Sequence, residues 1–310
     1  MRLLMFGVTS MVNFDIDLVV PFVDNTDPVW QKVFTDYCNK TGDLEHLATL
    51  HGARFDDFGM FRYCLRTIDK FMPWIRNIYL IVSNIEQVPD YINKAKTKVI
   101  LHKDIIPAEY LPTFNSTTIE MFIPNIPGLS EHFIYTNDDM YALQPLTKDD
   151  FFTEDGKIKL DFTRRDIRMN GKQFRKVCLN NHQHVTESLG LRHDEFTYLK
   201  PNHSFTPMIK SHCKLCLRFL GDIVTKNIGA FRTEFQHNQY IYPIFEYFTG
   251  NHVFGAPPFI YLSFKRDPNY ICDCLLGGQY KVACINDVNL ADRSAVDYPK
   301  IKEALDKLIY

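Results

Sequence analysis

The sequence predicts an α/β fold with a mostly parallel sheet, helices on both faces and a less regular C-terminal half. Over the first half of the chain, short apolar runs typical of buried strands alternate with segments of helical spacing. The chain has 310 residues, of which 45% are hydrophobic and 23% charged. These values suit one large globular domain and argue against widespread disorder.

The strands and helices of the first half are predicted from their apolar spacing. A helix over residues 59–71 has apolar side chains at helical spacing and is closed by Pro73. A second helix opens at the capping-box pattern Thr117-x-x-Glu120 and stops near Pro124. Buried strands are predicted over residues 16–23, 78–83, 98–101 and 132–136.

The second half is less periodic. We expect a hairpin over residues 151–168, which turns at Asp155-Gly156, and a loop-like segment with short strands over 262–282. The predicted helices cover residues 176–191, 210–220, 235–248 and 298–308. The two halves, 14–150 and 151–310, are expected to form one continuous domain.

Charge and hydropathy exclude several classes of function. The 35 basic and 37 acidic residues give a net charge of −2, so the basic excess of a nucleic-acid-binding protein is missing. No apolar run approaches the roughly 18 residues of a membrane span. The N-terminus lacks the pattern of a signal peptide. We therefore expect a cytoplasmic protein whose contact with a membrane, where it has one, is peripheral.

The eight cysteines have two interpretations. In a cytoplasmic chain of this length they are expected to be reduced and mostly buried. Alternatively, Cys213-x-x-Cys216 and Cys272-x-Cys274 together supply four zinc ligands.

Two acidic clusters follow predicted strands. Asp24 and Asp27 come after the first strand, and Asp138 and Asp139 after the strand at 132–136. Ligands of parallel α/β sheets bind beyond the carboxyl ends of the strands, so the two clusters should share one site. Adjacent carboxylates suit Mg²⁺ or Mn²⁺ bound against a diphosphate. Helix capping and turn formation are the alternative for each aspartate.

Three basic side chains are further candidates. Arg62 and Arg66 share one helix face and could bind phosphate or form surface ion pairs. His203 lies in a predicted loop and could act as a general base or be structural. The sequence has no phosphate-binding P-loop, no dinucleotide-binding glycine motif, no nucleophile elbow and no His-Glu-x-x-His motif.

Four blocks of sequence resemble the signature regions of the Stealth family. The first is Ile16 to Pro28, and the second runs from Arg54-Phe55-Asp56-Asp57 to Asn137-Asp138-Asp139. The third resembles its counterpart at His203-Ser204-Phe205-Thr206-Pro207 and at Phe231-Arg232, and the fourth at Cys284-Ile285-Asn286-Asp287. The resemblance spans about residues 16 to 290.

This resemblance implies a Rossmann-like nucleotide-sugar transferase. The enzyme would move hexose-1-phosphate or N-acetylhexosamine-1-phosphate from a UDP-sugar to a sugar hydroxyl of a capsular or cell-surface polysaccharide. A phosphodiester would form and UMP would leave. Residues 14–150 would then bind the donor, and residues 151–310 would serve the acceptor and the lid. A lipid-linked acceptor would bring the enzyme to the inner face of the membrane.

The resemblance also implies roles for single residues. Asp138 and Asp139 would hold Mg²⁺ or Mn²⁺. His203, in preference to Asp24, would take the proton of the acceptor hydroxyl. The transferred phosphoryl group would be neutralised by three arginines, Arg62, Arg66 and Arg232. The substrates would be held by Asp27, Asn115, Ser116, Asn286 and Asp287.

Two other functions remain open on the sequence. A metal-dependent glycosyltransferase would use the same donor but release UDP. A non-catalytic carbohydrate-binding protein would stack sugars on some of the 25 Phe, 16 Tyr and 2 Trp residues.

Overall fold

A computed structural model describes residues 10–50, 55, 57–168, 172–286 and 296–310. Its centre is a five-stranded sheet in the order β3-β2-β1-β4-β9. The first four strands are parallel, and β9 is antiparallel to β4. The strands are β1 (Ile16–Pro21), β2 (Ile78–Val82), β3 (Thr97–Leu101), β4 (His132–Tyr135) and β9 (Thr206–Ile209). The predicted α/β class with a mostly parallel sheet is confirmed.

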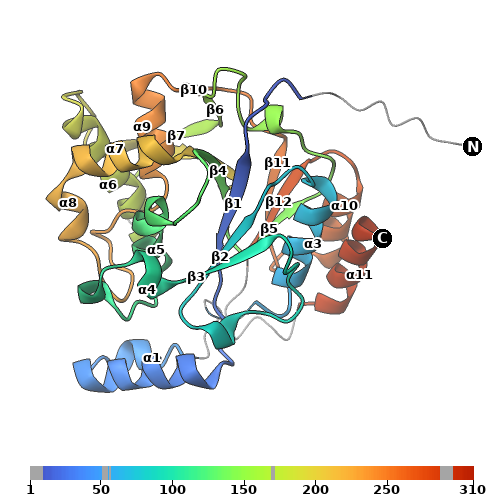
Figure 1. The fold of residues 1–310 in the computed structure, drawn as a ribbon, viewed down its shortest axis with the longest axis horizontal. Helices are drawn as coiled ribbons and strands as arrows, with labels where there is room; N and C mark the ends of the chain where they lie inside the picture. The colour runs from blue at the N-terminus through green and yellow to red at the C-terminus, as the bar shows by residue number, and fades with distance from the viewer. Residues whose placement is uncertain (1–9, 51–54, 56, 169–171, 287–295) are drawn as a thin grey trace, which may run out of the picture.

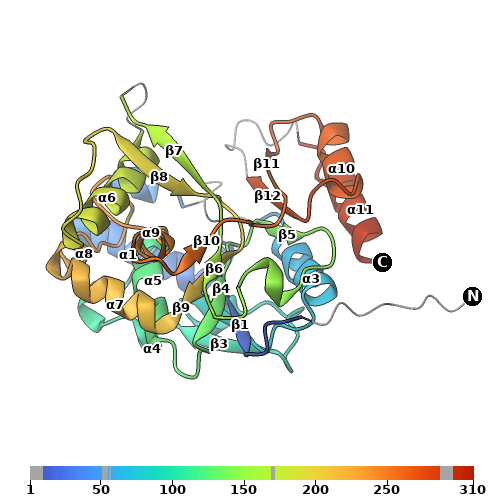
Figure 2. The same ribbon diagram turned by 90° about the horizontal axis from the view of Figure 1, so that it is seen from above.

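Helices cover both faces of the sheet (Figures 1 and 2). On one face lies α3 (Phe61–Phe71), and α11 (Tyr298–Ile309) packs on α3, with α10 (Pro268–Leu276) beside α11. The opposite face is covered by α4 (His102–Ile105), α5 (Ser116–Phe122), α6 (Gln173–Ser188), α7 (Lys210–Leu220), α8 (Asp222–Thr225) and α9 (Ile241–Thr249). Helices α1 (Pro28–Thr41) and α2 (Leu44–Leu47) lie beyond the end of β1.

Two apolar cores result from the alternation of side chains along the strands. In β1, Leu18 and Val20 point into the core under α3, whereas Val19 points into the core under α5 and α9. All three side chains are completely buried. A strand covered on both faces is apolar on both sides, which explains the apolar run from Leu18 to Val20 that marked β1 in the sequence.

Smaller sheets complete the fold. Strands β11 (Phe259–Ser263), β12 (Val282–Asn286) and β5 (Met140–Ala142) form a three-stranded sheet beside α10 and α11. Two pairs, β6 (Ile158–Lys159) with β10 (His252–Val253) and β7 (Phe162–Asp166) with β8 (Thr197–Pro201), lie nearer α6 and α9. The predicted division of the chain near residue 150 stays a prediction.

Several predicted elements differ from the structure. The segment 151–168 forms a short hairpin around Asp155-Gly156, with an antiparallel bridge between Phe152 and Ile158, but its last part, β7, pairs with β8 instead of extending that hairpin. Helix α5 is capped by Asn115, whose side chain accepts the Thr117 N–H, and not by Thr117 itself. Helices α1 and α10 were missed, although each begins with an aspartate N-cap followed by proline, at Asp27-Pro28 and Asp267-Pro268.

An ion pair between Asp17 and Arg76 joins the N-terminal ends of β1 and β2, and Ser130 connects it to the start of β4. The Asp17 side chain is completely buried and accepts hydrogen bonds from Arg76 Nε at 2.9 Å, Arg76 Nη2 at 2.6 Å and the Ser130 N–H at 2.7 Å. Burial raises the pKa of Asp17, but the bonds from Arg76 and Ser130 outweigh it and hold the pKa below its usual value. The carboxylate therefore stabilises the fold above the unfolded-state pKa, and that contribution is lost as the pH falls through the lowered folded-state pKa.

Replacing Asp17 with alanine should lower the free energy of unfolding by about 3 kcal/mol, because Arg76 and the Ser130 N–H lose their acceptor. Asp15 contacts the same arginine at 3.2 Å but is 67% exposed, so the control Asp15→Ala should cost about 0.5 kcal/mol or less. Urea unfolding at neutral pH measures both values. Equal losses in the two variants would contradict the interpretation of Asp17 as the buried anchor.

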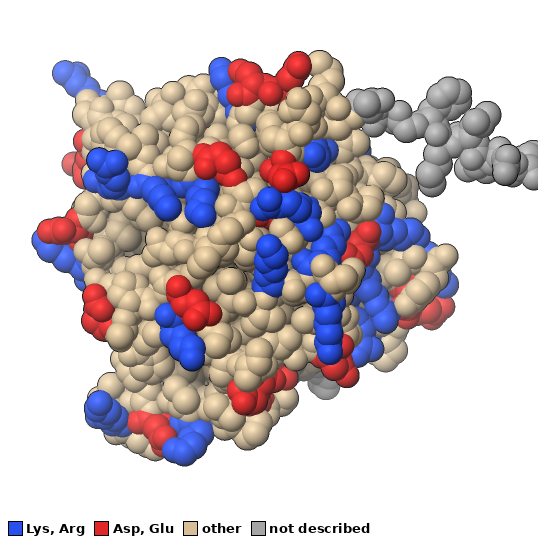
Figure 3. All heavy atoms as spheres, viewed as in Figure 1, with Lys and Arg blue, Asp and Glu red and all other residues tan. Residues whose placement is uncertain are grey.

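The surface charges, the helices and the cysteines bear on three further interpretations of the sequence. On the face seen in Figure 3, basic and acidic side chains are interspersed rather than gathered by sign. Within the described part of the chain, no helix has the length and apolarity to span a bilayer. All eight cysteines are free thiols. Cys213 and Cys216 are buried in the core under α9, whereas Cys272 and Cys274 pack against the other core, so these four do not form a zinc site.

Candidate active site

The candidate site lies beyond the carboxyl ends of β1, β2 and β4. From β1 the chain proceeds to β2 and β3 on one side of the sheet, and β4 lies on the other side. The order of the strands thus reverses between β1 and β4, which is where ligands of open α/β sheets bind. Asp24 and Asp27 follow β1, and Asp138 and Asp139 follow β4, as the sequence predicted.

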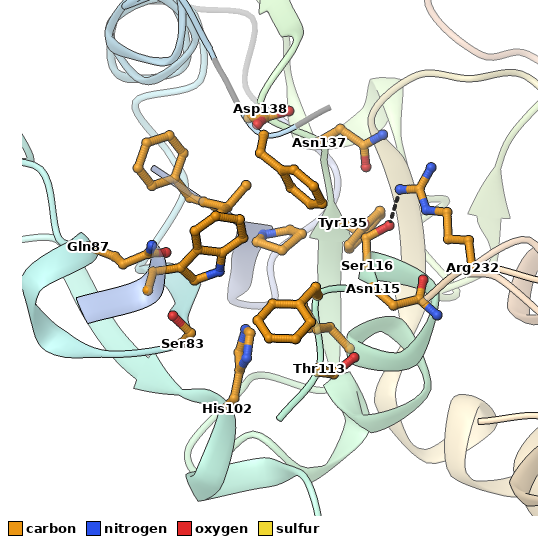
Figure 4. Close-up of a pocket in the computed structure, with 17 residues that line it drawn as sticks. Ser83, Gln87, His102, Thr113, Asn115, Ser116, Tyr135, Asn137, Asp138 and Arg232 are labelled. Atoms are coloured by element: carbon orange, nitrogen blue, oxygen red, sulfur yellow. Dashed lines mark hydrogen bonds between the residues drawn. The ribbon is translucent and has the colours of Figure 1, made fainter. Parts of the chain in front are cut away.

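An open pocket at this edge has two chemically different ends (Figure 4). Asp138, Asn137, Ser116 and Arg232 form a charged and polar end. Gln87, Ser83 and His102 form a neutral end on the opposite side. The remaining lining is mostly apolar or aromatic and includes Phe22, Val23, Trp30, Phe55, Phe114, Ile119 and Tyr135. This polarity suits a ligand with a planar apolar part joined to an anionic part.

Arg232 belongs to a hydrogen-bonded network at the charged end. Its Nη2 atom donates to Ser116 Oγ at 2.6 Å. Behind Ser116 lies Glu120, which is buried and accepts bonds from the Tyr135 hydroxyl and the Gln239 N–H, both at 2.9 Å. Burial raises the pKa of Glu120 to about 7. The network fixes the positions of Ser116 and Tyr135, and Arg232 still extends to the surface.

Asn115 brings two distant segments together. Its side chain is completely buried and accepts the Thr117 N–H at the start of α5. Its amide nitrogen donates to the Gly229 and Phe231 carbonyls and to Gln236 Oε1. Asn115 thereby holds the loop before α9 against α5, which places Arg232 beside Ser116. The structure supports a positioning role for Asn115.

The two aspartates after β4 have different surroundings. Burial, followed by repulsion from Asp139 and Asp57, raises the pKa of Asp138 to about 7. The buried Asp139 Oδ1 atom has no hydrogen-bond partner among the described residues, and its Oδ2 accepts the Cys284 thiol at 3.2 Å. One ligand atom each of Asp139, His203 and Cys284 lie within 4.8 Å of one another. Crowded carboxylates with an unpaired oxygen fit a divalent cation.

His203 lies next to these aspartates. Its Nε2 atom is 3.4 Å from the Asn137 amide nitrogen, and its Nδ1 atom is 2.9 Å from the Tyr240 hydroxyl. Because an amide nitrogen donates, Nε2 is assigned as an acceptor and Nδ1 carries the proton. Burial lowers the pKa of His203 below its usual value, although Asp139 opposes the shift. At neutral pH the ring is therefore neutral, and its Nε2 lone pair faces the amide of Asn137, which lines the pocket.

The carboxylates of Asp24 and Asp27 accept hydrogen bonds from nearby residues of the turn and of helix α1. Asp24 Oδ1 accepts the Thr26 N–H at 2.8 Å and the Thr26 hydroxyl at 2.6 Å. Asp27 is buried and caps α1, where its oxygens accept the Val29 and Trp30 N–H groups, and it also accepts the Asn84 amide. Among the described residues, neither aspartate lines the pocket, although Val23, next to Asp24, does.

Three other predicted residues, Arg62, Arg66 and Asn286, do not line the pocket. Arg62 is 4.7 Å from the centre of the Tyr91 ring, and Arg66 is 5.8 Å from that of Tyr310. Asn286 is exposed at the end of β12. Asp287 lies outside the described residues. The binding roles predicted for these four residues stay predictions.

Sequence reasoning missed the neutral end of the pocket. Ser83 follows β2, Gln87 ends the short 3₁₀ helix Ile85–Gln87, and His102 follows β3 directly. All three lie at or shortly after the carboxyl end of a predicted strand, where ligands of such sheets bind. As uncharged side chains they were not singled out in the sequence. Tyr240 was missed because it lies far from His203 along the chain.

Part of the chain that forms this site matches a known protein family. Residues 54–160 match the family model described as Stealth protein CR2, conserved region 2. The receptor polysaccharide phosphotransferase WefC of Streptococcus oralis is 30% identical over 329 aligned residues, which cover 95% of this chain and 97% of that protein. The chain belongs to the Stealth family. The predicted resemblance is thereby confirmed.

Two further curated relatives of this Stealth protein are matched over part of their length. The exopolysaccharide phosphotransferase cps2G of Lactiplantibacillus plantarum is 37% identical over 198 residues, which are 62% of this chain and 56% of that protein. The capsular polysaccharide phosphotransferase LcbA of Aeromonas hydrophila is 34% identical over 230 residues, 72% of this chain and 62% of that protein. The Stealth region matched at 54–160 contains Ser116, Glu120 and both aspartates after β4.

Proposed function

We propose that this Stealth protein transfers a sugar-1-phosphate, a hexose- or N-acetylhexosamine-1-phosphate, from a UDP-sugar to a hydroxyl of a capsular or cell-surface polysaccharide. The observation that carries the proposal is the polarity of the pocket. Its neutral aromatic end suits a nucleobase, and its charged end presents Arg232, Ser116 and Asp138 where a diphosphate would lie. The phosphotransferase names of its relatives agree with this chemistry.

In the proposed phosphoryl transfer, Arg232 of the charged end and the nearby His203 each have a defined role. The acceptor oxygen attacks the phosphorus nearest the sugar, a new P–O bond forms, and the P–O bond to the bridging oxygen breaks. UMP leaves with the bridging oxygen. His203 Nε2 takes the proton of the acceptor hydroxyl, since its lone pair is unprotonated at neutral pH. Arg232, held by Ser116, stabilises the negative charge on the transferred phosphoryl oxygens.

A divalent cation fits the site beside these groups. The carboxylates of Asp138 and Asp139 would hold Mg²⁺ or Mn²⁺, and the unpaired Oδ1 of Asp139 supports this placement. When bound, the ion supplies positive charge against the diphosphate. Tyr240 orients His203, because its hydroxyl oxygen accepts a hydrogen bond from the Nδ1–H group.

The proposed acceptor is carried by a lipid, which has a consequence for where the enzyme acts. A growing polysaccharide on a lipid carrier would present its hydroxyl at the membrane surface. The enzyme would then work in the cytoplasm, peripherally at the inner face of the membrane.

The nucleotide that leaves tests this function. Purified protein, supplied with a panel of UDP-sugars, an oligosaccharide acceptor and Mn²⁺, should release UMP. A glycosyltransferase with the same donor would release UDP. A non-catalytic carbohydrate-binding protein would release neither nucleotide.

Replacing Arg232 with methionine should lower the turnover rate about 100-fold, because one charged donor to the transferred phosphoryl group is lost. Arg62→Met and Arg66→Met serve as comparisons, since both arginines lie over tyrosine rings outside the pocket lining. Initial rates at saturating donor measure the difference. If Arg62→Met or Arg66→Met loses more than Arg232→Met, the phosphate-binding arginine is misassigned.

A further inference from the structure

Two buried polar atoms at the neutral end of the pocket have no hydrogen-bond partner among the described residues. They are Gln87 Oε1 and His102 Nε2. Gln87 is 2% exposed and His102 is 7% exposed, and both side chains line the pocket. Buried polar groups in folded proteins are almost always paired, so two orphans in one pocket indicate partners that arrive with a ligand.

The surroundings of Gln87 Oε1 and His102 Nε2 determine which hydrogen bonds these two atoms can form. Gln87 Nε2 donates to the Asp24 backbone carbonyl at 3.0 Å, which fixes the orientation of the amide and leaves Oε1 as an acceptor. Burial lowers the pKa of His102 to about 4, so its ring is neutral and carries one N–H group. The pocket thus presents an acceptor on one side chain and a neutral imidazole on the other.

Aromatic rings enclose the space beside these two side chains. The ring of Trp30 lies 5.1 Å from that of Phe55 and 5.8 Å from that of Phe114, measured between centroids. All three rings line the pocket. Figure 4 places Gln87, Ser83 and His102 on the side away from Arg232 and Asn137. A planar heterocycle bound there would leave its phosphates toward the charged end.

We infer that Gln87 and His102 select the nucleobase of the donor and that they favour uracil; this inference rests on the proposed nucleotide-sugar donor. The N3–H group of uracil would donate to Gln87 Oε1. The C4 carbonyl of uracil, where cytosine has an amino group, would accept the N–H of His102 Nε2. The Gln87 amide would keep its bond to the Asp24 carbonyl, and the base would meet its Oε1 atom. Cytosine has a lone pair at N3, which would face the Gln87 oxygen unfavourably.

Binding of nucleotides to the unmodified protein tests the inference without any substitution. Calorimetry would compare UDP, CDP and a UDP that carries a methyl group on N3. UDP should bind at least about tenfold more tightly than either of the others, because each loses a hydrogen bond to a buried group. Equal affinity for UDP and its N3-methyl derivative would overturn the inference.

Substitutions with a matched control identify the side chains. Gln31 Nε2 donates to the Asn25 carbonyl at 2.7 Å, so it supports the same loop as Gln87 but does not line the pocket. Gln87→Met should reduce the preference for UDP over CDP at least about tenfold, and His102→Phe should do the same. Gln31→Met should keep the preference. An unchanged preference in folded Gln87→Met and His102→Phe would overturn the assignment.

Different results would disprove the base-selection inference and the proposed UDP-sugar donor. If the unmodified protein releases UMP but its base preference is insensitive to Gln87 and His102, only the base-selection inference is wrong. If it binds no uridine nucleotide and releases no UMP from any UDP-sugar, the proposed donor is wrong as well.

Discussion

Turnover should fall about 10³-fold when Asp138 is replaced by asparagine, since the neutral amide removes one of the two carboxylates proposed to hold the cation. Asp138 lines the pocket directly beside the proposed path of the diphosphate. The control is Asp155→Asn, an exposed turn aspartate that accepts a bond from Thr153; its activity should be unchanged. Initial rates over a range of Mn²⁺ concentrations measure the effect. Full activity of Asp138→Asn would remove Asp138 from the metal site.

The raised pKa of Asp138 predicts that the Asp138→Asn variant also differs from the unsubstituted protein in stability. A carboxyl whose pKa is raised to about 7 in the folded, metal-free protein contributes stability below its unfolded-state pKa. That stability is lost as the pH rises through about 7. In metal-free protein near pH 8, Asp138→Asn should therefore unfold at a higher urea concentration than the unsubstituted protein. Mn²⁺ affinity should weaken about tenfold per pH unit below 7, as the ion competes with one proton.

Replacing His203 with alanine should also lower turnover about 10³-fold, because the acceptor hydroxyl loses its general base. Burial holds the pKa of His203 below 6.5, so the base is neutral across the physiological range. With saturating metal, activity of the unsubstituted protein should rise with pH through a value below 6.5 and then level off. The rate–pH profile and single-turnover rates measure both effects.

Two further variants separate a base from a structural histidine. Tyr240→Phe removes the partner of His203 Nδ1; it should lower turnover less than His203→Ala and shift the acid limb of the profile. His193→Ala, at a histidine that pairs with Glu187, should leave the profile unchanged. A His203→Ala protein that retains full activity, with Asp24→Ala inactive, would transfer the role of base to Asp24.

The parts of the fold that depend on local pattern were predictable. Strand β2, and strand β1 after Asp17, are apolar because both faces are buried. Helix α3 has apolar residues at helical spacing, and Pro73 follows its end. The pairing of β7 with β8 was not predictable. It depends on α6, which lies between them along the chain, and no local pattern reports such a contact.

The site was predictable to the extent that it lies at strand ends. Asp138 and Asp139 were found because carboxylates directly after a buried strand are conspicuous. Gln87 and His102 are ordinary residues in the sequence, and only their burial without a partner marks them. The contact between Arg232 and Ser116 spans 116 residues of chain and depends on the buried Asn115, so it required the three-dimensional structure.

The fate of the phosphorus atom nearest the sugar decides most directly which bond breaks. The accepted UDP-sugar would be labelled with radioactive phosphorus at that position and supplied with acceptor and Mn²⁺. Transfer of a sugar-1-phosphate predicts that the label appears in the polysaccharide product, in a phosphodiester, and that the released UMP is unlabelled. Label recovered entirely in released UDP, with an unlabelled product, would contradict it.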